Sequence, residues 1–278
     1  MSFYAQSGVN IDEGNRFVTL IRDMVSSTHS PNVIGGLGGF AGIYNISPHK
    51  LREPVLVSST DGVGTKLKVA IAAGKLSSIG IDLVAMSIND ILVAGAHPLF
   101  FLDYISTSKL SPEILREVVA GIVEGCKIAE VSLLGGETAE MPGLYADGDF
   151  DLAGFAVGIA DKSALMDKSK VAPGDIIIGA ASSGFHSNGY SLLRKIFFED
   201  SALKTTDAIE GFGCVADLLL TPTKIYTAVV QEVLQRSEVH AMAHITGGGF
   251  YDNITRVLPD NCCAIIDKSL IQEPPPIK

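Results

Sequence analysis

Residues 80–105 read GIDLVAMSINDILVAGAHPLFFLDYI, two apolar segments joined across a proline. Apolar residues recur at three- and four-residue spacing through the first segment, Gly80–Ala96, which is typical of a mostly buried helix. Asn89 and Asp90 interrupt this pattern with polar groups. After Pro98, the apolar run Leu99–Ile105 predicts a strand. We therefore expect a buried helix that carries a carboxylate and leads directly into a strand.

The segments on both sides continue the alternation of strand and helix. Upstream, Pro54–Thr60 predicts a strand that ends in a polar loop, and downstream Ser111 and Pro112 provide the cap and first turn of a helix. Further strands are expected at 131–134, 152–159, 175–181, 239–245 and 264–266, and further helices at 190–198, from Pro222 onward and at 253–258. This order predicts an α+β or α/β protein whose two halves are separated by the polar segment Lys162–Gly174.

Length and charge exclude several classes of protein. The chain has 278 residues, 47% hydrophobic and 19% charged, which predicts about two folded domains and excludes a disordered chain. Its net charge of −10 disfavours nucleic acid and anionic membranes as partners. A polyanionic substrate would therefore need local neutralisation by a metal. No apolar stretch is long enough to span a membrane and no signal peptide is recognisable, so we expect a cytoplasmic protein with reduced cysteines.

Four glycine-rich segments could present backbone N–H groups to phosphate oxygens. They are GGLGGF (35–40), DGVGTK (61–66), GGE (135–137) and TGGG (246–249). Each alone is more often an ordinary turn. The lysine of DGVGTK follows threonine, without the glycine spacing of a Walker phosphate loop, and GGLGGF follows a polar segment rather than the strand of a dinucleotide fold. Walker chemistry is excluded and a dinucleotide fold is disfavoured.

Three acids and two histidines are candidates for chemistry. Asp61, Asp90 and Glu137 lie at strand ends or at the polar break of the apolar helix, where carboxylates could hold Mg²⁺ on a triphosphate. The alternative for each alone is a cap or a turn. His186 and His244 directly precede polar loops of small residues, so they are candidates for substrate contact or proton transfer, the alternative being hydrogen-bonded structural histidines.

Several of these segments resemble one enzyme family, the aminoimidazole ribonucleotide synthetases, also called phosphoribosylformylglycinamidine cyclo-ligases. The matching stretches are GVNID (8–12), GGLGGF (35–40), STDGVGTK (59–66), residues 80–104, GGETAEMPG (135–143), GFHSNGYSLLRK (184–195) and HITGGGFYDNITRVLP (244–259). The pattern Asp90-x4-Gly95-Ala96-x-Pro98 is similar to the signature of a wider superfamily of ATP enzymes, which includes selenophosphate synthetase and thiamine-monophosphate kinase.

The resemblance implies an ATP- and Mg²⁺-dependent ligase that forms a C–N bond in purine biosynthesis. It would convert formylglycinamidine ribonucleotide to aminoimidazole ribonucleotide, with release of ADP and phosphate. The implied fold is a two-domain α+β subunit whose N-terminal sheet pairs into a barrel across a homodimer. We expect an N-terminal ATP-binding domain over 1–165 and a C-terminal α/β domain over 170–278 that is shorter than in relatives.

The resemblance also implies roles for single residues. Asp90, His186, His244 and Lys66 would be catalytic, and Asp61, Asp90 and Glu137 would hold the metal. Nucleotide contacts would come from Gly35, Gly36, Gly38, Gly39, Asp61, Gly62, Gly64, Thr65, Lys66 and Glu137. Substrate contacts would come from His186, Ser187, Asn188, Thr246, Gly247, Gly248 and Gly249.

Two alternatives stay open from the sequence. The first is another ATP enzyme of the superfamily. A selenophosphate synthetase should carry an early reactive cysteine, yet no cysteine precedes Cys126, and the GGETAEMPG and GFHSNGYSL stretches disfavour the kinase. The second is a non-catalytic binding protein derived from the family, which loss of the acids would mark, although all three acids are present.

Overall fold

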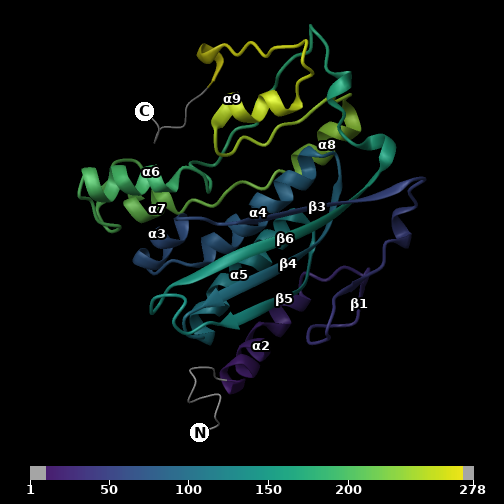
Figure 1. The fold of residues 1–278 in the computed structure, drawn as a ribbon. Coiled ribbons are helices and arrows are strands. Elements are labelled where there is room, and N and C mark those ends of the chain that lie inside the picture. Colours follow the sequence, from purple (N-terminus) through teal and green to yellow (C-terminus); the bar gives the residue numbers. More distant parts are fainter. Residues whose placement is uncertain (1–10, 272–278) are drawn as a thin grey trace.

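A four-stranded mixed sheet forms the centre of the N-terminal half (Figure 1). The computed structural model describes residues 11–271, so residues 8–10 of the GVNID motif and the last residues of the chain lie outside the described part. The strands are β3 (Pro54–Gly62), β4 (His97–Thr107), β5 (Ser132–Glu140) and β6 (Phe150–Asp161). They lie in the order β3-β6-β4-β5, with β6 antiparallel to both neighbours and β4 parallel to β5.

Pairing with β4 extends β5 beyond its predicted end. Gly135, Gly136 and Glu137 pair with Leu102, Asp103 and Tyr104 of β4. The predicted glycine loop at 135–137 is therefore wrong, because the parallel ladder supplies hydrogen bonds that keep this glycine-rich segment extended.

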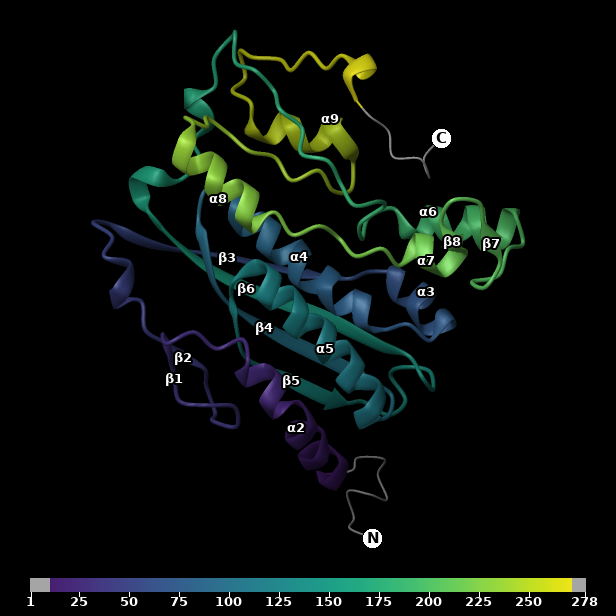
Figure 2. The ribbon, with the colours of Figure 1, turned by 180° about the vertical axis from the view of Figure 1, so that it is seen from behind.

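Helices cover one face of this sheet, as Figure 2 shows from behind. They are α2 (Ile11–Ser26), α4 (Ser77–Val93) and α5 (Pro112–Ala129), and α3 (Lys66–Ala73) packs beside α4. Among these four helices, α4 and α5 supply most of the buried apolar side chains. The opposite face leaves Leu56, Tyr104 and Phe155 exposed by 64%, 38% and 42%. A hairpin of β1 (Val33–Ile34) and β2 (Ile43–Tyr44) lies near β4, with the Tyr44 ring 5.4 Å from that of Phe100.

The C-terminal half is built from short elements beside α3 and α4 (Figure 1). Its helices are α6 (Tyr190–Arg194), the π-helical continuation η4 (Lys195–Asp200), α7 (Val215–Leu219), α8 (Thr227–Arg236) and α9 (Gly249–Ile254). Its strands are β7 (Ala208–Ile209) and β8 (Gly213–Cys214). Single 3-10 turns are η1 (Ser47–His49), η2 (Lys162–Ala164), η3 (Lys168–Lys170), η5 (Thr255–Val257) and η6 (Lys268–Leu270).

Several predicted elements of this half are wrong. The segments 175–181, 239–245 and 264–266 form no strand, since no described residue pairs with them in a ladder, and Ile176 and Ile178 are 87% and 88% exposed. The helix predicted from Pro222 begins only at Thr227. Local apolar patterns predict a strand, but a strand also needs a hydrogen-bonding neighbour.

Within residues 11–271, no helix combines the length and the apolar character that a membrane span requires.

Helices α4 and α5 approach each other so closely that only glycine fits at the crossing. A Cβ on Gly121 would lie 1.8 Å from the carbonyl oxygen of Ser77, and one on Gly80 would lie 2.4 Å from the amide nitrogen of Ile122. These backbone contacts cannot yield as a flexible side chain could. The crossing fixes the depth at which α4, with Asp82 and Asp90, sits on the sheet.

We predict that Gly121→Ala lowers the free energy of unfolding by about 1–3 kcal/mol through overpacking, although alanine normally stabilises a helix by about 1 kcal/mol over glycine. Gly14→Ala in α2 is the control, because a Cβ there meets nothing within 4 Å, and it should be stabilising. Urea unfolding measures both, and a stabilised Gly121→Ala variant would contradict the close crossing.

Candidate functional site

A cavity of about 330 Å³ lies between the two halves of the chain. The N-terminal half contributes Asp61 from the end of β3 and Asp90 from α4. The C-terminal half contributes the segment around His244 and the end of α9. The lining residues are Asp61, Asp90, Val93, Met242, Ala243, His244, Thr246, Asn253, Arg256 and Val257. The cavity thus brings together four residues that the sequence singled out, namely Asp61, Asp90, His244 and Thr246.

Asp90 links α4 to both neighbouring segments. Its Oδ1 lies 2.9 Å from Nδ1 of His244, and its Oδ2 accepts a hydrogen bond of 3.1 Å from the Ser59 hydroxyl. The His244 side chain is only 10% exposed, and its Nε2 is buried without a hydrogen-bond partner among the described residues. A buried polar atom without a partner costs about 1–3 kcal/mol, which a bound group can recover. The pair therefore has the geometry of a carboxylate that orients an imidazole.

Asp61 is the second carboxylate of the cavity. Its Oδ1 accepts a hydrogen bond of 2.8 Å from the backbone N–H of Gly62. Burial raises the pKa of Asp61, and the nearby charge of Asp90 raises it further, while the Gly62 N–H and His244 act in the opposite sense. Two carboxylates that line one cavity and repel each other favour a shared cation or proton.

Asn253 organises the loop Thr246–Gly249, a role that the sequence analysis missed. This side chain is 3% exposed, and its Nδ2 lies 3.3, 3.2 and 2.8 Å from the carbonyl oxygens of Thr246, Gly247 and Gly249. The signal available in the sequence was an asparagine four residues after a run of three glycines. Because Asn253 gathers the carbonyl groups on one side, the loop keeps one fixed shape at the cavity.

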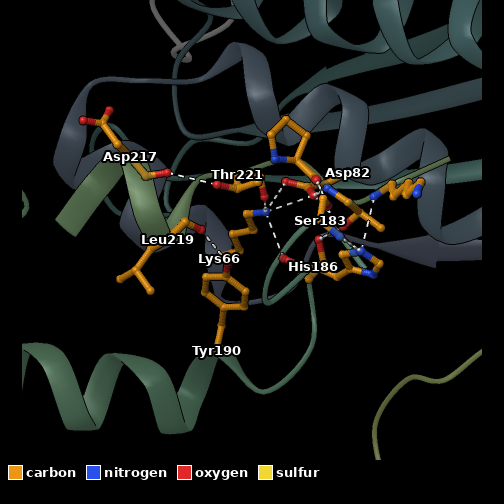
Figure 3. A network of polar contacts seen from close by, with 12 residues as sticks. Lys66, Asp82, Ser183, His186, Tyr190, Asp217, Leu219 and Thr221 are labelled. Carbon is orange, nitrogen blue, oxygen red and sulfur yellow. Dashed lines mark hydrogen bonds and ion pairs between the residues drawn. The ribbon is translucent and has the colours of Figure 1, made fainter. Parts of the chain in front are cut away.

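Lys66 lies in a buried network rather than at a phosphate-accessible surface (Figure 3). The side chains of Lys66 and Asp82 are both 0% exposed, with Nζ 2.8 Å from Oδ2 and 3.0 Å from Oδ1 of Asp82. Nζ also donates to the carbonyl oxygens of His186 and Thr221, at 2.9 and 2.8 Å. These acceptors use its three N–H donors. The expected phosphate contact of Lys66 is therefore corrected: this ammonium group joins the two halves of the chain.

Asp82 completes this network. Its Oδ1 accepts hydrogen bonds from the backbone N–H and the hydroxyl of Thr223, at 2.7 and 2.6 Å. Burial lowers the pKa of Lys66, which the charge of Asp82 and its hydrogen bond oppose. The same contacts hold Thr221 and Thr223 outside a helix, which is consistent with α8 beginning later than the sequence predicts.

His186 also has a structural contact. Its Nε2 accepts the backbone N–H of Ser183 at 3.1 Å, and its backbone takes the left-handed conformation, with φ of 56°. Burial lowers the pKa of His186 to about 4, helped by the charges of Lys66, His244 and Lys224. His186 is therefore neutral near pH 7 and its accepting nitrogen is occupied. A base must be neutral, but the lone pair of Nε2 is already occupied by the Ser183 N–H, so the structure does not show His186 poised for the proton transfer expected from the sequence.

Glu137 and the first glycine loop lie outside the cavity. Asp61 is on β3 and Glu137 on β5, the two outer strands of the sheet, so three strand spacings of about 4.8 Å, roughly 14 Å, separate them. Among the described residues, no group of three metal-binding side chains is assembled. The predicted metal site of Asp61, Asp90 and Glu137 is therefore corrected, because Glu137 is too distant within one chain. Gly35, Gly36, Gly38 and Gly39 belong to the exposed turn between β1 and β2.

The remaining predicted residues form two turns near the network. Gly62 ends β3, and Gly64 and Thr65 lie in the connection from β3 to α3, with Gly64 at φ of 70°. Ser187 contacts the hydroxyl of Thr223 at 3.1 Å, and Asn188 follows it in the same loop. Both turns adjoin the residues that bind Lys66.

The fold and cavity define a protein of the AIR synthase related class. Residues 41–160 match the N-terminal domain profile of AIR synthase related proteins, and residues 172–278 match the C-terminal domain profile. A phosphoribosylformylglycinamidine cyclo-ligase of Desulfatibacillum aliphaticivorans is 54% identical over 264 residues, which cover 95% of this chain and 76% of that relative. The chain belongs to the phosphoribosylformylglycinamidine cyclo-ligase family, which confirms the prediction from the motifs.

Solved structures support the same two-domain α+β fold. Thiamine-monophosphate kinase from Stenotrophomonas maltophilia K279a superposes with a TM-score of 0.65 at 19% identity, over 86% of this chain and 70% of that one. Hydrogenase maturation protein HypE in complex with ATP gives a TM-score of 0.53 at 18% identity, over 82% and 59% of the two chains. At these identities the likeness shows the fold alone.

We predict that Asp82→Ala lowers the free energy of unfolding by about 3–5 kcal/mol, because it leaves the Lys66 ammonium buried without its counter-charge. Lys195→Met is the control, since it breaks an ion pair whose side chains are both 56% exposed, and exposed pairs contribute only about 0–1 kcal/mol. Urea unfolding measures both. Equal effects of the two substitutions would contradict the structural role of the buried pair.

We predict that His186 makes stability depend on pH. In the unfolded chain a histidine gains a proton below its ordinary pKa of 6.5, whereas folded His186 gains one only near pH 4. The contribution of neutral His186 to the free energy of unfolding is therefore fully present above pH 6.5 and is lost as the pH falls toward 4. His186→Gln, which can still accept a hydrogen bond, should flatten the loss of unfolding free energy across this window.

His240→Gln is the matched control for this measurement. A hydrogen bond to Asp175 raises the pKa of His240. The contribution of His240 to the free energy of unfolding therefore changes with pH in the direction opposite to that of His186, and it is lost as the pH rises. An unfolding profile of His186→Gln that is as steep as that of the wild type would overturn the assignment.

Proposed function

We propose that this chain catalyses the ATP-dependent cyclisation of formylglycinamidine ribonucleotide to aminoimidazole ribonucleotide. The single observation that carries the proposal is the cavity in which Asp61, Asp90 and His244 converge, in a chain 49–54% identical to curated cyclo-ligases. The cavity offers carboxylates that could hold the metal ion of a metal–nucleotide complex and an oriented imidazole that could accept a proton. Both are needed by a reaction that transfers a phosphoryl group and then closes a ring.

The reaction has two bond-making steps. First, the γ-phosphoryl group moves from ATP to the formyl oxygen of the substrate, and ADP is formed. The formyl oxygen, a poor leaving group, thereby becomes part of a phosphate, which is a good one. Then the amidine-side nitrogen attacks the former carbonyl carbon, a C–N bond forms, the C–O bond breaks and phosphate leaves. The attacking nitrogen must give a proton to a base. No covalent intermediate with the protein is required.

Asp61 and Asp90 fit a Mg²⁺ ion that arrives with a nucleotide. Magnesium is commonly held by one or two carboxylates, while phosphate oxygens and water complete its coordination. The cavity supplies two carboxylates, and burial together with their mutual repulsion makes a shared cation favourable there. When bound, the ion would neutralise negative charge on the phosphates. The two aspartates would hold and orient the triphosphate.

His244 is the proposed base of the second step. Asp90 accepts from its Nδ1, which places the lone pair on Nε2, the nitrogen without a partner in the described part of the chain. His186 is excluded from this role because its Nε2 already accepts a backbone N–H. Its position beside Ser187 and Asn188 instead suits the shaping of a substrate-binding loop.

The loops around the cavity complete the proposed substrate site. Thr246, Gly247, Gly248 and Gly249 would contact the substrate, with Ser187 and Asn188 from the second loop. Gly62, Gly64 and Thr65 would contact the nucleotide. The proposed domains span residues 1–165 and 170–278, and the two family profiles lie on either side of residues 161–171.

A homodimer and a cytoplasmic location are parts of the same proposal. The apolar side chains on the helix-free face of the sheet, Leu56, Tyr104 and Phe155, are exposed and could be covered by the same face of a second copy to form a barrel. All four cysteines are free thiols, as is usual in a reducing compartment.

Purified protein with ATP, Mg²⁺ and formylglycinamidine ribonucleotide should form aminoimidazole ribonucleotide and ADP in equal amounts. His244→Gln should lower kcat by about 10²- to 10⁴-fold, the usual contribution of a positioned base. The base is needed only in the second step, ring closure, and not in the first step, phosphoryl transfer from ATP to the formyl oxygen. ADP and product are both quantified by chromatography.

The control variant is Asp200→Asn, which changes an exposed acid outside the cavity and should leave turnover unchanged. Absence of both products with the folded wild-type protein would refute the proposed function. Full turnover by His244→Gln would refute the role of His244 alone.

A further inference from the structure

We propose that Arg256 binds a phosphomonoester, the 5′-phosphate of the ribonucleotide substrate. This inference rests on the proposed function and adds the residue that recognises the phosphate. Among the ten described residues that line the cavity, Arg256 is the only arginine or lysine. It lies on η5 (Thr255–Val257), directly after α9. Arg256 lies within the stretch HITGGGFYDNITRVLP (244–259), but its sequence pattern alone indicates no role for it.

The guanidinium group of Arg256 is available for a ligand. Its side chain is exposed, and none of the described residues forms a hydrogen bond or an ion pair with it, whereas Arg16 and Arg236 each contact a glutamate. A guanidinium offers five donors in a planar fork, and this geometry matches two oxygens of a phosphate group. Arg256 is therefore a cation of the cavity whose donors the described protein does not use.

Electrostatics favour an anion at Arg256 rather than near the aspartates. Asp61 and Asp90 would repel a phosphate dianion that carries no metal, and the whole chain has a net charge of −10. A triphosphate with Mg²⁺ fits the carboxylates because the cation neutralises it. A monoester without a metal needs a cationic side chain instead. The cavity offers one place for each kind of phosphate.

The loop held by Asn253 adjoins the cavity, which Thr246 and Asn253 both line. Asn253 gathers the carbonyl oxygens of Thr246, Gly247 and Gly249. In a planar trans peptide the C=O and the following N–H point in opposite directions, so the N–H groups of Gly247 and Gly248 point away from Asn253. Neither glycine is among the described residues that line the cavity, so the phosphate recognition proposed here rests on Arg256. Asn253 is a positioning residue for this loop, and Arg256 supplies the charge.

The space beside Gly248 shows how tightly the loop is set. A Cβ on Gly248 would lie 2.2 Å from Oδ2 of Asp252, and its φ is 90°. The Asp252 carboxylate therefore occupies the side-chain direction of Gly248.

Arg256→Gln should raise the KM for formylglycinamidine ribonucleotide by roughly 10- to 100-fold, as expected when a charged hydrogen-bond pair is lost, and should change the KM for ATP by less than twofold. Arg256→Lys should recover only part of the loss, since it keeps the charge but not the fork. Arg236→Gln is the matched control, because Arg236 is an exposed arginine that pairs with Glu232 outside the cavity, and it should change neither KM.

Calorimetry without ATP separates this inference from the proposed function. Wild-type protein should bind the ribonucleotide at least ten times more tightly than the dephosphorylated ribonucleoside, and Arg256→Gln should lose this preference even if turnover is absent. A preference retained in Arg256→Gln overturns the phosphate role. A rise in the KM for ATP alone also overturns it, because Arg256 would then contact the nucleotide. A wild type that binds no ribonucleotide overturns the proposed function and, with it, this inference.

Discussion

The buried ion pair of Lys66 and Asp82 is the interaction on which the arrangement of the two halves depends. Both side chains are fully buried, and their remaining hydrogen bonds go to Thr221, Thr223 and the carbonyl of His186 in the C-terminal half. A buried charge is tolerated only where its partner and hydrogen bonds are all in place. The pair therefore permits one relative placement of α3, α4 and the C-terminal loops, and the cavity forms only in that placement.

In that placement, the donors of Lys66 are used within the protein, whereas those of Arg256 are available to a ligand. Lys66, the conspicuous cation of the DGVGTK segment, has its donors used by the protein, while Arg256 faces the cavity with its donors available. The acidic residues divide in a similar way. Asp82 is neutralised inside the protein, whereas Asp61 and Asp90 remain at the cavity, where their repulsion favours a cation. The distribution of charge is thus set by burial rather than by residue type.

The sequence predicted three strands of the central sheet and two of its helices, because local patterns suffice there, but it did not predict α2 and α3. The strands at β3, β4 and β6 and the helices α4 and α5 follow apolar spacing and a Ser-Pro helix start. The patterns failed where a partner decides the outcome. Residues 135–137 are extended because β4 pairs with them, and residues 175–181 form no ladder because no described strand adjoins them.

The sequence by itself determined the family, the acids and the histidine that meet in the cavity, because their segments are distinctive in composition and spacing. Only the tertiary structure decided which predicted residues act together. In the folded chain, Glu137 lies on the far edge of the sheet, Lys66 is buried, and the accepting nitrogen of His186 is occupied. Asn253 and Arg256, for which the sequence indicated no role, line the cavity. The physical reason is that a residue's partners come from segments distant in the chain, and burial and hydrogen bonding with those partners fix its charge and its free donors.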